Sequence, residues 1–214
     1  FKDYWLEYPP LFLWVLQLVG LLALQIPPWL DPLFVPNLLF RWVLTAFDLG
    51  NFALLVAIAR RVNGQGREHL PAILWALSYT ALVTFLGWYD GLATFWLLLT
   101  LYAVLTDRAE LAGASMAIGF CIKVFPALLG PLALLSLSGW HKRLRMLAVG
   151  AIVMAAVFGP LYLTAPRFVE SWLMNMAGRP SWETVWALLD GSTGYVPVSP
   201  LQLHNQPPAA PDSV

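Results

Sequence analysis

Hydrophobic residues in this chain come in long runs, and charged or turn-forming residues separate one run from the next. A membrane helix needs about 20 mostly apolar residues to cross a hydrocarbon core of roughly 30 Å. Six stretches come near that length: Leu11–Leu30, Leu38–Ala59, Leu70–Trp88, Gly91–Thr106, Leu111–Leu137 and Leu144–Leu163. The pattern therefore predicts an all-α, polytopic membrane protein with about six hydrophobic segments.

The same pattern divides the chain into three parts. Residues 1–10 are expected to end an outer loop, residues 11–163 to form the transmembrane region, and residues 164–214 to form an outer-face loop with a Pro-rich tail. Within that last part, Ser181–Leu189 carries Trp182, Val185, Trp186 and Leu189 at helical spacing. One apolar face of this kind predicts an interfacial helix that lies on the outer leaflet.

Composition strengthens the membrane assignment and excludes other classes. The chain is 59% hydrophobic and 11% charged, whereas an ordinary soluble domain is about 45–50% apolar and about 25% charged. A 23.8 kDa particle cannot bury so much apolar surface. Its 12 basic and 12 acidic residues balance, so a nucleic-acid protein is not expected. A lone Cys121 excludes an intrachain disulfide and a cysteine zinc site.

Basic residues in short loops mark the cytoplasmic side of a membrane protein. The richest loops are Arg60–Arg67 and Lys142–Arg145, so both are predicted to be inside, with Asp90 and the C-terminal loop outside. With this orientation, Leu111–Leu137 must leave one side of the membrane and return to the same side. A re-entrant hairpin would explain this, and so would an error in the side assigned to the weakly charged Asp107–Glu110 turn. The first segment either enters from the cytoplasm or dips in and out.

Lys123 is the sharpest chemical feature, because an ionisable group inside hydrocarbon needs a partner or a purpose. Pro126 cannot donate to the carbonyl of Ile122 and disfavours helical geometry at Phe125, so the helix is predicted to break near the lysine. A cation at a broken helix suits an anionic phosphate. The alternative is a lysine that snorkels or pairs internally.

Asp90 follows Gly87-Trp88-Tyr89 at the outer end of a predicted helix. Its carboxylate could orient a sugar hydroxyl, bind a metal or act as a base; the structural alternative is an N-cap for the helix that follows. Arg41, Thr45 and Asp48 share one helix face, with Asn51 near its edge, and a helix–helix polar contact explains them best.

Small residues recur at Gly113, Ser115, Ala117 and Gly119, which predicts close helix packing. Arg179, beside the predicted interfacial helix, could reach a lipid phosphate; the commoner alternative is an arginine that is solvated or bound to a headgroup. No nucleotide-binding glycine motif, zinc-protease motif or hydrolase nucleophile motif is present, and the three histidines show no metal-ligand spacing.

Several segments, in order, resemble the C-type (GT-C) membrane glycosyltransferases. Asp3–Leu11, which ends in Tyr8-Pro9-Pro10-Leu11, resembles the segment that closes their first outer loop. Gly87–Leu92, Ala112–Gly119 and Lys123–Leu129 resemble glycosyltransferase family 87, and Arg179–Trp186 resembles one subgroup of it. The likeness extends from Asp3 to about Asp190.

The resemblance implies an inverting transfer of a hexose, such as mannose, from a polyprenyl-phosphate sugar to a lipid or glycan acceptor. The reaction would take place at the outer face of the plasma (inner) membrane. The main catalytic base would precede Phe1, so the chain is expected to be an interior piece of a longer protein, inactive alone. The residues to which the family's roles extend are Asp90, as a supporting carboxylate, and Lys123, Glu7, Tyr8, Tyr89 and Arg179, as substrate-binding residues.

Two other classes stay open. A transporter or flippase of a lipid-linked or anionic substrate could use the same broken helix, although a secondary transporter should show a second, matching break. A non-catalytic scaffold would be favoured if the first outer loop of the full reading frame held no acidic residue. A single carboxylate neither defines nor rules out a divalent metal, and no other cofactor is predicted.

Overall fold

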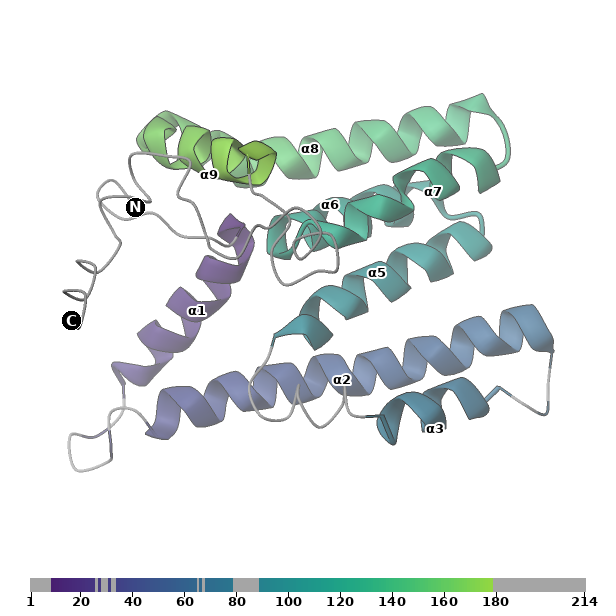
Figure 1. The fold of residues 1–214 in the computed structure, drawn as a ribbon, viewed down its shortest axis with the longest axis horizontal. Helices are drawn as coiled ribbons and strands as arrows, with labels where there is room; N and C mark the ends of the chain where they lie inside the picture. The colour runs from purple at the N-terminus through teal and green to yellow at the C-terminus, as the bar shows by residue number, and fades with distance from the viewer. Residues whose placement is uncertain are drawn as a thin grey trace, which may run out of the picture. The chain divides into compact units, whose positions relative to one another are not determined.

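The computed structural model describes residues 9–25, 27, 31, 34–64, 66, 68–78 and 89–178. All regular structure among them is helical (Figure 1). The elements are α1 (Pro10–Ala23), α2 (Phe34–Asn63), α3 (Leu70–Ala76), α5 (Asp90–Leu105), α6 (Ala109–Ile122), the 3₁₀ helix η1 (Phe125–Leu129), α7 (Gly130–Ser136), α8 (Trp140–Thr164) and α9 (Pro166–Gly178). The chain divides into two compact units, residues 9–155 and residues 1–8 with 156–214.

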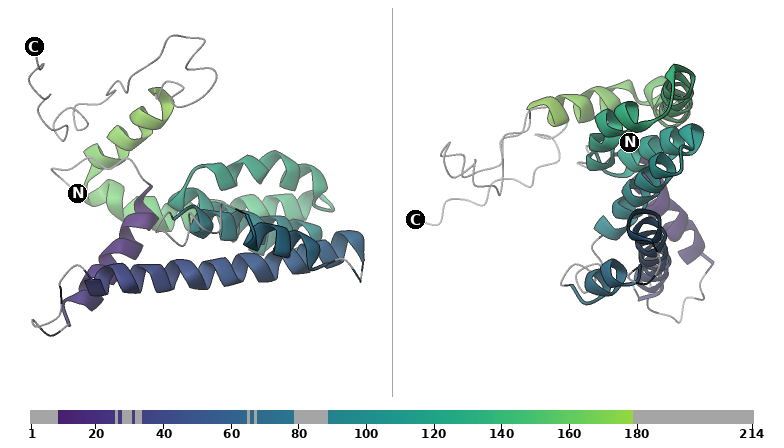
Figure 2. Two further views of the ribbon diagram at one scale, coloured as in Figure 1. Left: turned by 60° about the horizontal axis from the view of Figure 1, so that its bottom comes forward. Right: turned by 90° about the vertical axis from the view of Figure 1, so that its right-hand side faces the viewer.

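Helix α5 is the centre of the first unit. It packs against α2 on one side and against α6, η1 and α7 on the other, while α2 also contacts α1 and α3 (Figure 2). Two fully buried hydroxyls join α5 to α6, with 2.9 Å between Thr100 Oγ1 and Ser115 Oγ. Each hydroxyl also lies within hydrogen-bond distance of a carbonyl four residues earlier in its own helix, Trp96 for Thr100 and Leu111 for Ser115.

The small residues of α6 allow this close packing, as the sequence predicted. A Cβ at Gly113 would overlap the backbone carbonyl of Met146 in α8. A Cβ at Gly119 would lie 2.7 Å from the Pro126 Cβ and 2.9 Å from the Trp96 Cβ. The two glycines therefore face different neighbours: Gly113 lets α8 approach α6, and Gly119 lets α5 and η1 approach it.

Residues 109–136 form a broken hairpin that leaves one end of the first unit and returns to it. Helix α6 has 14 residues and is about 21 Å long. Together η1 and α7 have 12 residues, and at the rises of 3₁₀ and α-helices they run back over about 20 Å. The two arms match in length, so this part of the chain returns to the end from which it started; its topology in a membrane stays a prediction.

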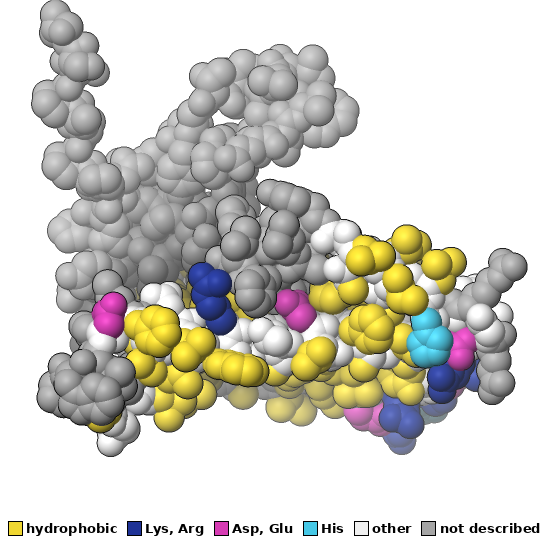
Figure 3. All heavy atoms as spheres, turned by 90° about the horizontal axis from the view of Figure 1, so that it is seen from below, with side chains coloured by type: hydrophobic (Ala, Val, Ile, Leu, Met, Phe, Trp, Pro, Cys, Tyr) yellow, Lys and Arg dark blue, Asp and Glu magenta, His cyan; other side chains and the backbone are white. Residues whose placement is uncertain are grey.

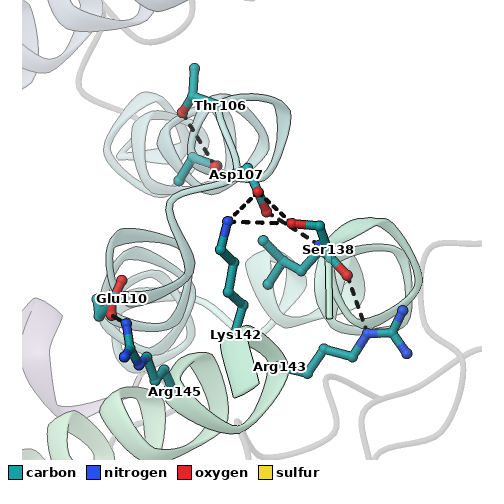
Figure 4. A network of polar contacts seen from close by, with 9 residues as sticks. Thr106, Asp107, Glu110, Ser138, Lys142, Arg143 and Arg145 are labelled. Atoms are coloured by element: carbon teal, nitrogen blue, oxygen red, sulfur yellow. Dashed lines mark hydrogen bonds and ion pairs between the residues drawn. The ribbon is translucent and has the colours of Figure 1, made fainter. Parts of the chain in front are cut away.

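Asp107 ties the two ends of this hairpin together (Figure 4). Its Oδ1 accepts from the Ser138 backbone N–H at 3.2 Å, and its Oδ2 accepts from the Ser138 hydroxyl at 2.5 Å and from the Lys142 ammonium. The lysine and then the serine lower the pKa of Asp107 to about 2, because these bonds favour the ionised carboxylate. Asp107 also has a left-handed backbone, with φ of 57°, which reverses the chain after α5.

The charge-rich connections lie at one end of the first unit. The α2–α3, α5–α6 and α7–α8 connections all lie at the right-hand end in Figure 1. At this end Arg60 pairs with Glu68 at 3.6 Å, and Arg145 pairs with Glu110 at 3.3 Å. These connections therefore lie together in the fold, and the prediction that Arg60–Arg67 and Lys142–Arg145 are cytoplasmic stays a prediction.

Two described helices, α2 with 30 residues and α8 with 25, are long and apolar enough to cross a membrane. Only 17% and 22% of their most apolar windows are buried, unlike the core helix of a soluble protein. Figure 3 shows hydrophobic side chains over much of the described surface on the α2 and α3 side, with a cluster of charged groups at one end and a few others along the face. This apolar exterior indicates association with a membrane.

Three predicted segments differ from the structure. Helix α1 ends at Ala23 and is about 21 Å long, short of the roughly 30 Å that a full span needs. Helix α3 covers only the start of Leu70–Trp88, whose later residues lie outside the described ones. Residues 166–178 were expected to be a loop but form α9, in which Phe168 and Trp172 are buried on one face. The polar pair Glu170-Ser171 between those aromatics conceals the helical period.

Candidate functional site

The chain breaks at Lys123, as Pro126 predicted. Helix α6 ends at Ile122, and Lys123 is extended, with φ of −156° and ψ of 141°. The 3₁₀ helix η1 starts at Phe125 and places Pro126 in its first turn, where a missing N–H is tolerated. Lys123 itself is therefore the extended residue that follows α6, and its side chain does not continue the helical arrangement of the α6 side chains.

Asp90 and Lys123 form an ion pair, although they are 33 residues apart in the sequence. Their side chains are 39% and 37% exposed, so the pair remains accessible. Helix α5 supplies the aspartate and the end of α6 supplies the lysine, and the α5–α6 packing brings the two together. The structure therefore joins the two residues that the sequence singled out separately, and Lys123 has the internal partner named as its alternative.

Asp90 does not cap α5. It is the first residue of the helix, Tyr89 is at the N-cap position, and no side chain makes a capping bond there. A carboxylate in the first turn still interacts favourably with the helix dipole. The N-cap alternative is therefore wrong, because the carboxylate turns toward Lys123 instead of its own backbone.

Aromatic rings surround the ammonium group. Lys123 Nζ lies 5.3 Å from the ring centroid of Tyr89 and 6.0 Å from that of Phe125. Tyr89 in turn stacks on Phe12 of α1, with 4.0 Å between centroids. A cation over aromatic faces is stabilised by their quadrupoles, so the site holds its positive charge with one carboxylate and two rings.

The polar stripe of α2 reaches this region through its edge residue. Asn51 is fully buried and donates from Nδ2 to the Gly91 carbonyl of α5 at 2.8 Å, with Asp48 Oδ1 at 3.5 Å. Arg41 is exposed, and Thr45 donates to the Arg41 carbonyl within its own helix. The predicted helix–helix contact is therefore made by Asn51, with Asp48 beside it.

An apolar pocket of about 240 Å³ opens next to the broken helix. Its walls come from α6, η1 and α8, and they include Met116, Phe120, Ala127, Gly150 and Met154. Phe120 and Ala127 lie three residues before and four residues after Lys123 in the chain. The pocket therefore lies along the α6 turns that precede Lys123, without the lysine in its lining.

Sequence reasoning found Asp90, Tyr89 and Lys123, and the structure brings these three together. It missed Phe12 and Phe125, which are ordinary apolar residues in a membrane segment and carry no local signal. The predictions for Glu7, Tyr8 and Arg179 lie outside the described residues. Among the residues that are described, no three His, Cys, Asp or Glu side chains are close enough to hold a metal ion.

Comparison of the chain with protein-family models, with curated proteins and with solved structures finds no match. A functional assignment must therefore come from the geometry of the site together with the sequence resemblance.

Proposed function

We propose that this chain is the membrane-embedded part of a glycosyltransferase that moves a hexose from a polyprenyl-phosphate sugar to a lipid or glycan acceptor. It would be a multi-pass protein of the plasma membrane with its site on the outer face. The ion pair between Asp90 and Lys123 carries the proposal. It unites a cation suited to a phosphate with a carboxylate suited to a sugar hydroxyl, at a broken helix.

The surroundings of Lys123 fit a lipid phosphate in two ways. The amino end of α5 lies beside the lysine without a side-chain cap, and helix amino ends favour anions. The apolar pocket begins on the α6 turns that precede Lys123, about 5–10 Å toward Asp107. A phosphate at the lysine would therefore leave its hydrocarbon chain beside an apolar surface.

The chemistry assigns a separate role to each group. The acceptor hydroxyl oxygen attacks the anomeric carbon, the bond from that carbon to the phosphate oxygen breaks, and polyprenyl phosphate leaves with the electron pair. Lys123 stabilises the charge on the leaving phosphate, and Asp90, released from the lysine, orients a sugar hydroxyl. The acceptor proton passes to the acidic base that the resemblance assigns to the first outer loop of such enzymes.

Sugar transfer by membranes that contain the full-length protein tests this proposal. Polyprenyl-phosphate hexoses and nucleotide sugars are offered separately, and transfer is expected only from the lipid-linked donor. We expect Asp90→Asn to abolish transfer. Lys123→Ala should weaken donor binding about tenfold to a hundredfold, the range of a charge-assisted hydrogen bond.

A second ion pair supplies matched controls. Lys142 pairs with Asp107, and its side chain is 40% exposed, close to the 37% of Lys123. Lys142→Ala and Asp107→Asn should therefore leave the donor preference unchanged. Transfer from nucleotide sugars, or equal donor binding by Lys123→Ala and Lys142→Ala, would contradict the proposal.

A transporter or flippase of a lipid-linked or anionic substrate is the second candidate. The broken hairpin favours it, since discontinuous segments line the substrate sites of many transporters. Here Lys123 would bind the same phosphate, but the substrate would cross the membrane without a bond being broken. Flipping of a labelled polyprenyl-phosphate sugar in vesicles, without release of polyprenyl phosphate, would distinguish this function from transfer.

A further inference from the structure

Asn51 is the most deeply buried polar side chain near the site. Its exposed fraction is 0%, and it lies in the middle of α2, where neighbouring residues are apolar. A polar group buried among apolar residues destabilises a protein unless it makes hydrogen bonds. The bonds that Asn51 makes therefore show what the residue does.

The partners of Asn51 determine the orientation of its amide. The Gly91 carbonyl can only accept, so the NH₂ group must face it, at 2.8 Å. The same nitrogen has Asp48 Oδ1 at 3.5 Å, and Oδ1 of Asn51 has no hydrogen-bond partner among the described residues. The amide is therefore held by its donor side, with a strong bond to α5 and a long contact to the Asp48 carboxylate.

The Gly91 carbonyl belongs to the residue directly after Asp90. Next to Asn51 in α2, Gly50 lies so close to α5 that a Cβ there would be 2.6 Å from Phe95 Cε2. The first turn of α5 is thus fixed against α2 by a buried hydrogen bond, and the next turn is held there by close packing at Gly50. Because the first turn carries Asp90, its position sets where the carboxylate meets Lys123.

We propose that Asn51 is a positioning residue, which holds the first turn of α5 so that Asp90 pairs with Lys123, and that Asp48 orients the amide of Asn51. An effect of Asn51 on catalysis rests on the proposed glycosyltransferase function, because Asn51 would act through Asp90 and would touch neither donor nor acceptor. The positioning itself does not depend on that function.

Lysine acylation measures the pair without any sugar donor. The ion pair holds the Lys123 amine against the Asp90 carboxylate and partly covers it, so a displaced Asp90 should leave the amine more open to a reagent and make Lys123 react faster. The purified protein is treated with a water-soluble succinimidyl ester, and the acylation rates of Lys123 and Lys142 are read by mass spectrometry. Lys142 is the internal standard, since it is similarly exposed and paired with Asp107.

Three variants are compared with the unmodified protein. Asn51→Leu keeps the branched shape of the side chain in a somewhat larger residue and removes the amide, and Asp48→Asn removes only the carboxylate beside it. Thr100→Val is the matched control, because it removes another buried hydrogen bond of α5, the one to Ser115 in α6. We expect Asn51→Leu to raise the Lys123 rate about twofold or more, with a smaller rise for Asp48→Asn and none for Thr100→Val.

A rise at Lys123 with an unchanged rate at Lys142 supports the proposal. Unchanged Lys123 rates in both α2 variants, or an equal rise in Thr100→Val, would overturn it. If Asn51→Leu accelerates both lysines, the whole fold has loosened, and Asp48→Asn decides: a selective rise at Lys123 supports positioning, and no rise refutes it. These acylation rates test the positioning alone, because the assay does not require the protein to be a glycosyltransferase.

Discussion

Gly119 should couple the packing of α6 to the geometry of the site, and Gly119→Ala tests this directly. The glycine faces Pro126 of η1 and Trp96 of α5. Pro126 follows Lys123 by three residues, so a shift of η1 away from α6 moves the turn that carries the lysine. A single methyl group, placed far from any substrate, should therefore affect both stability and function.

The size of the effect follows from the distances. An added Cβ would lie 2.7 Å from the Pro126 Cβ, whereas carbon atoms are at their optimum about 3.5–4.0 Å apart. Either η1 or α5 must therefore move by about 1 Å. Overpacking of this kind costs about 1–3 kcal/mol, and a misplacement of about 1 Å in a catalytic site can reduce activity about a hundredfold.

Gly130→Ala is the matched control in the same hairpin. A Cβ at Gly130 would meet only Met116 Sδ, at 3.7 Å, which is an ordinary contact. Thermal unfolding in detergent should show a lower Tm for Gly119→Ala, by about 2–4 °C per kcal/mol, and little change for Gly130→Ala. Sugar transfer should fall only in Gly119→Ala. Equal Tm and equal transfer in the two variants would refute the coupling.

Three further predictions follow from the fold. Because Lys142 helps to lower the pKa of Asp107 from its ordinary value of 3.8 to about 2, the ionised carboxylate stabilises the fold above about pH 4, and this contribution is lost as the pH falls toward 2. The free energy of unfolding should therefore fall less between pH 4 and pH 2 in Asp107→Asn than in the unmodified protein. Identical pH profiles would contradict a stabilising contact of Asp107 with Ser138 and Lys142. A double-mutant cycle with Thr100→Val and Ser115→Ala should give a coupling of about 0.6 kcal/mol, as for other interhelical hydrogen bonds in membranes; strict additivity would show that the two hydroxyls do not interact. A cysteine at Arg60 should react with an impermeant reagent only after the membrane is opened, and labelling from outside would reverse the predicted orientation.

The sequence predicted the elements that depend on local pattern. Helix α5 was expected over Gly91–Thr106 and is observed over Asp90–Leu105. The break at Lys123 followed from the missing N–H of Pro126, a property of that residue alone. Close packing along α6 followed from its small residues, since side-chain size alone limits how near two helices can come.

Other features depend on how the helices are rotated against one another, which no local period records. Asp90 and Lys123 were each singled out, but only the α5–α6 packing makes them partners across 33 residues. The sequence places Asn51 at the edge of a polar stripe, and only the packing of α2 against α5 gives it a hydrogen bond to the Gly91 carbonyl.

The local pattern therefore predicts most of the apolar helices, the place where one of them breaks, and the charged residues near that break. Hydrophobic periodicity, a proline and a charge in an apolar run act within a few residues of the chain, so they can be read from it. Only the packing of the helices determines which charges meet. It brings Asp107, before the hairpin, to Lys142 after it, and it brings Asn51 of α2 to the first turn of α5. These contacts join residues 31 to 40 positions apart, and only packing of the intervening helices brings such groups within hydrogen-bond distance.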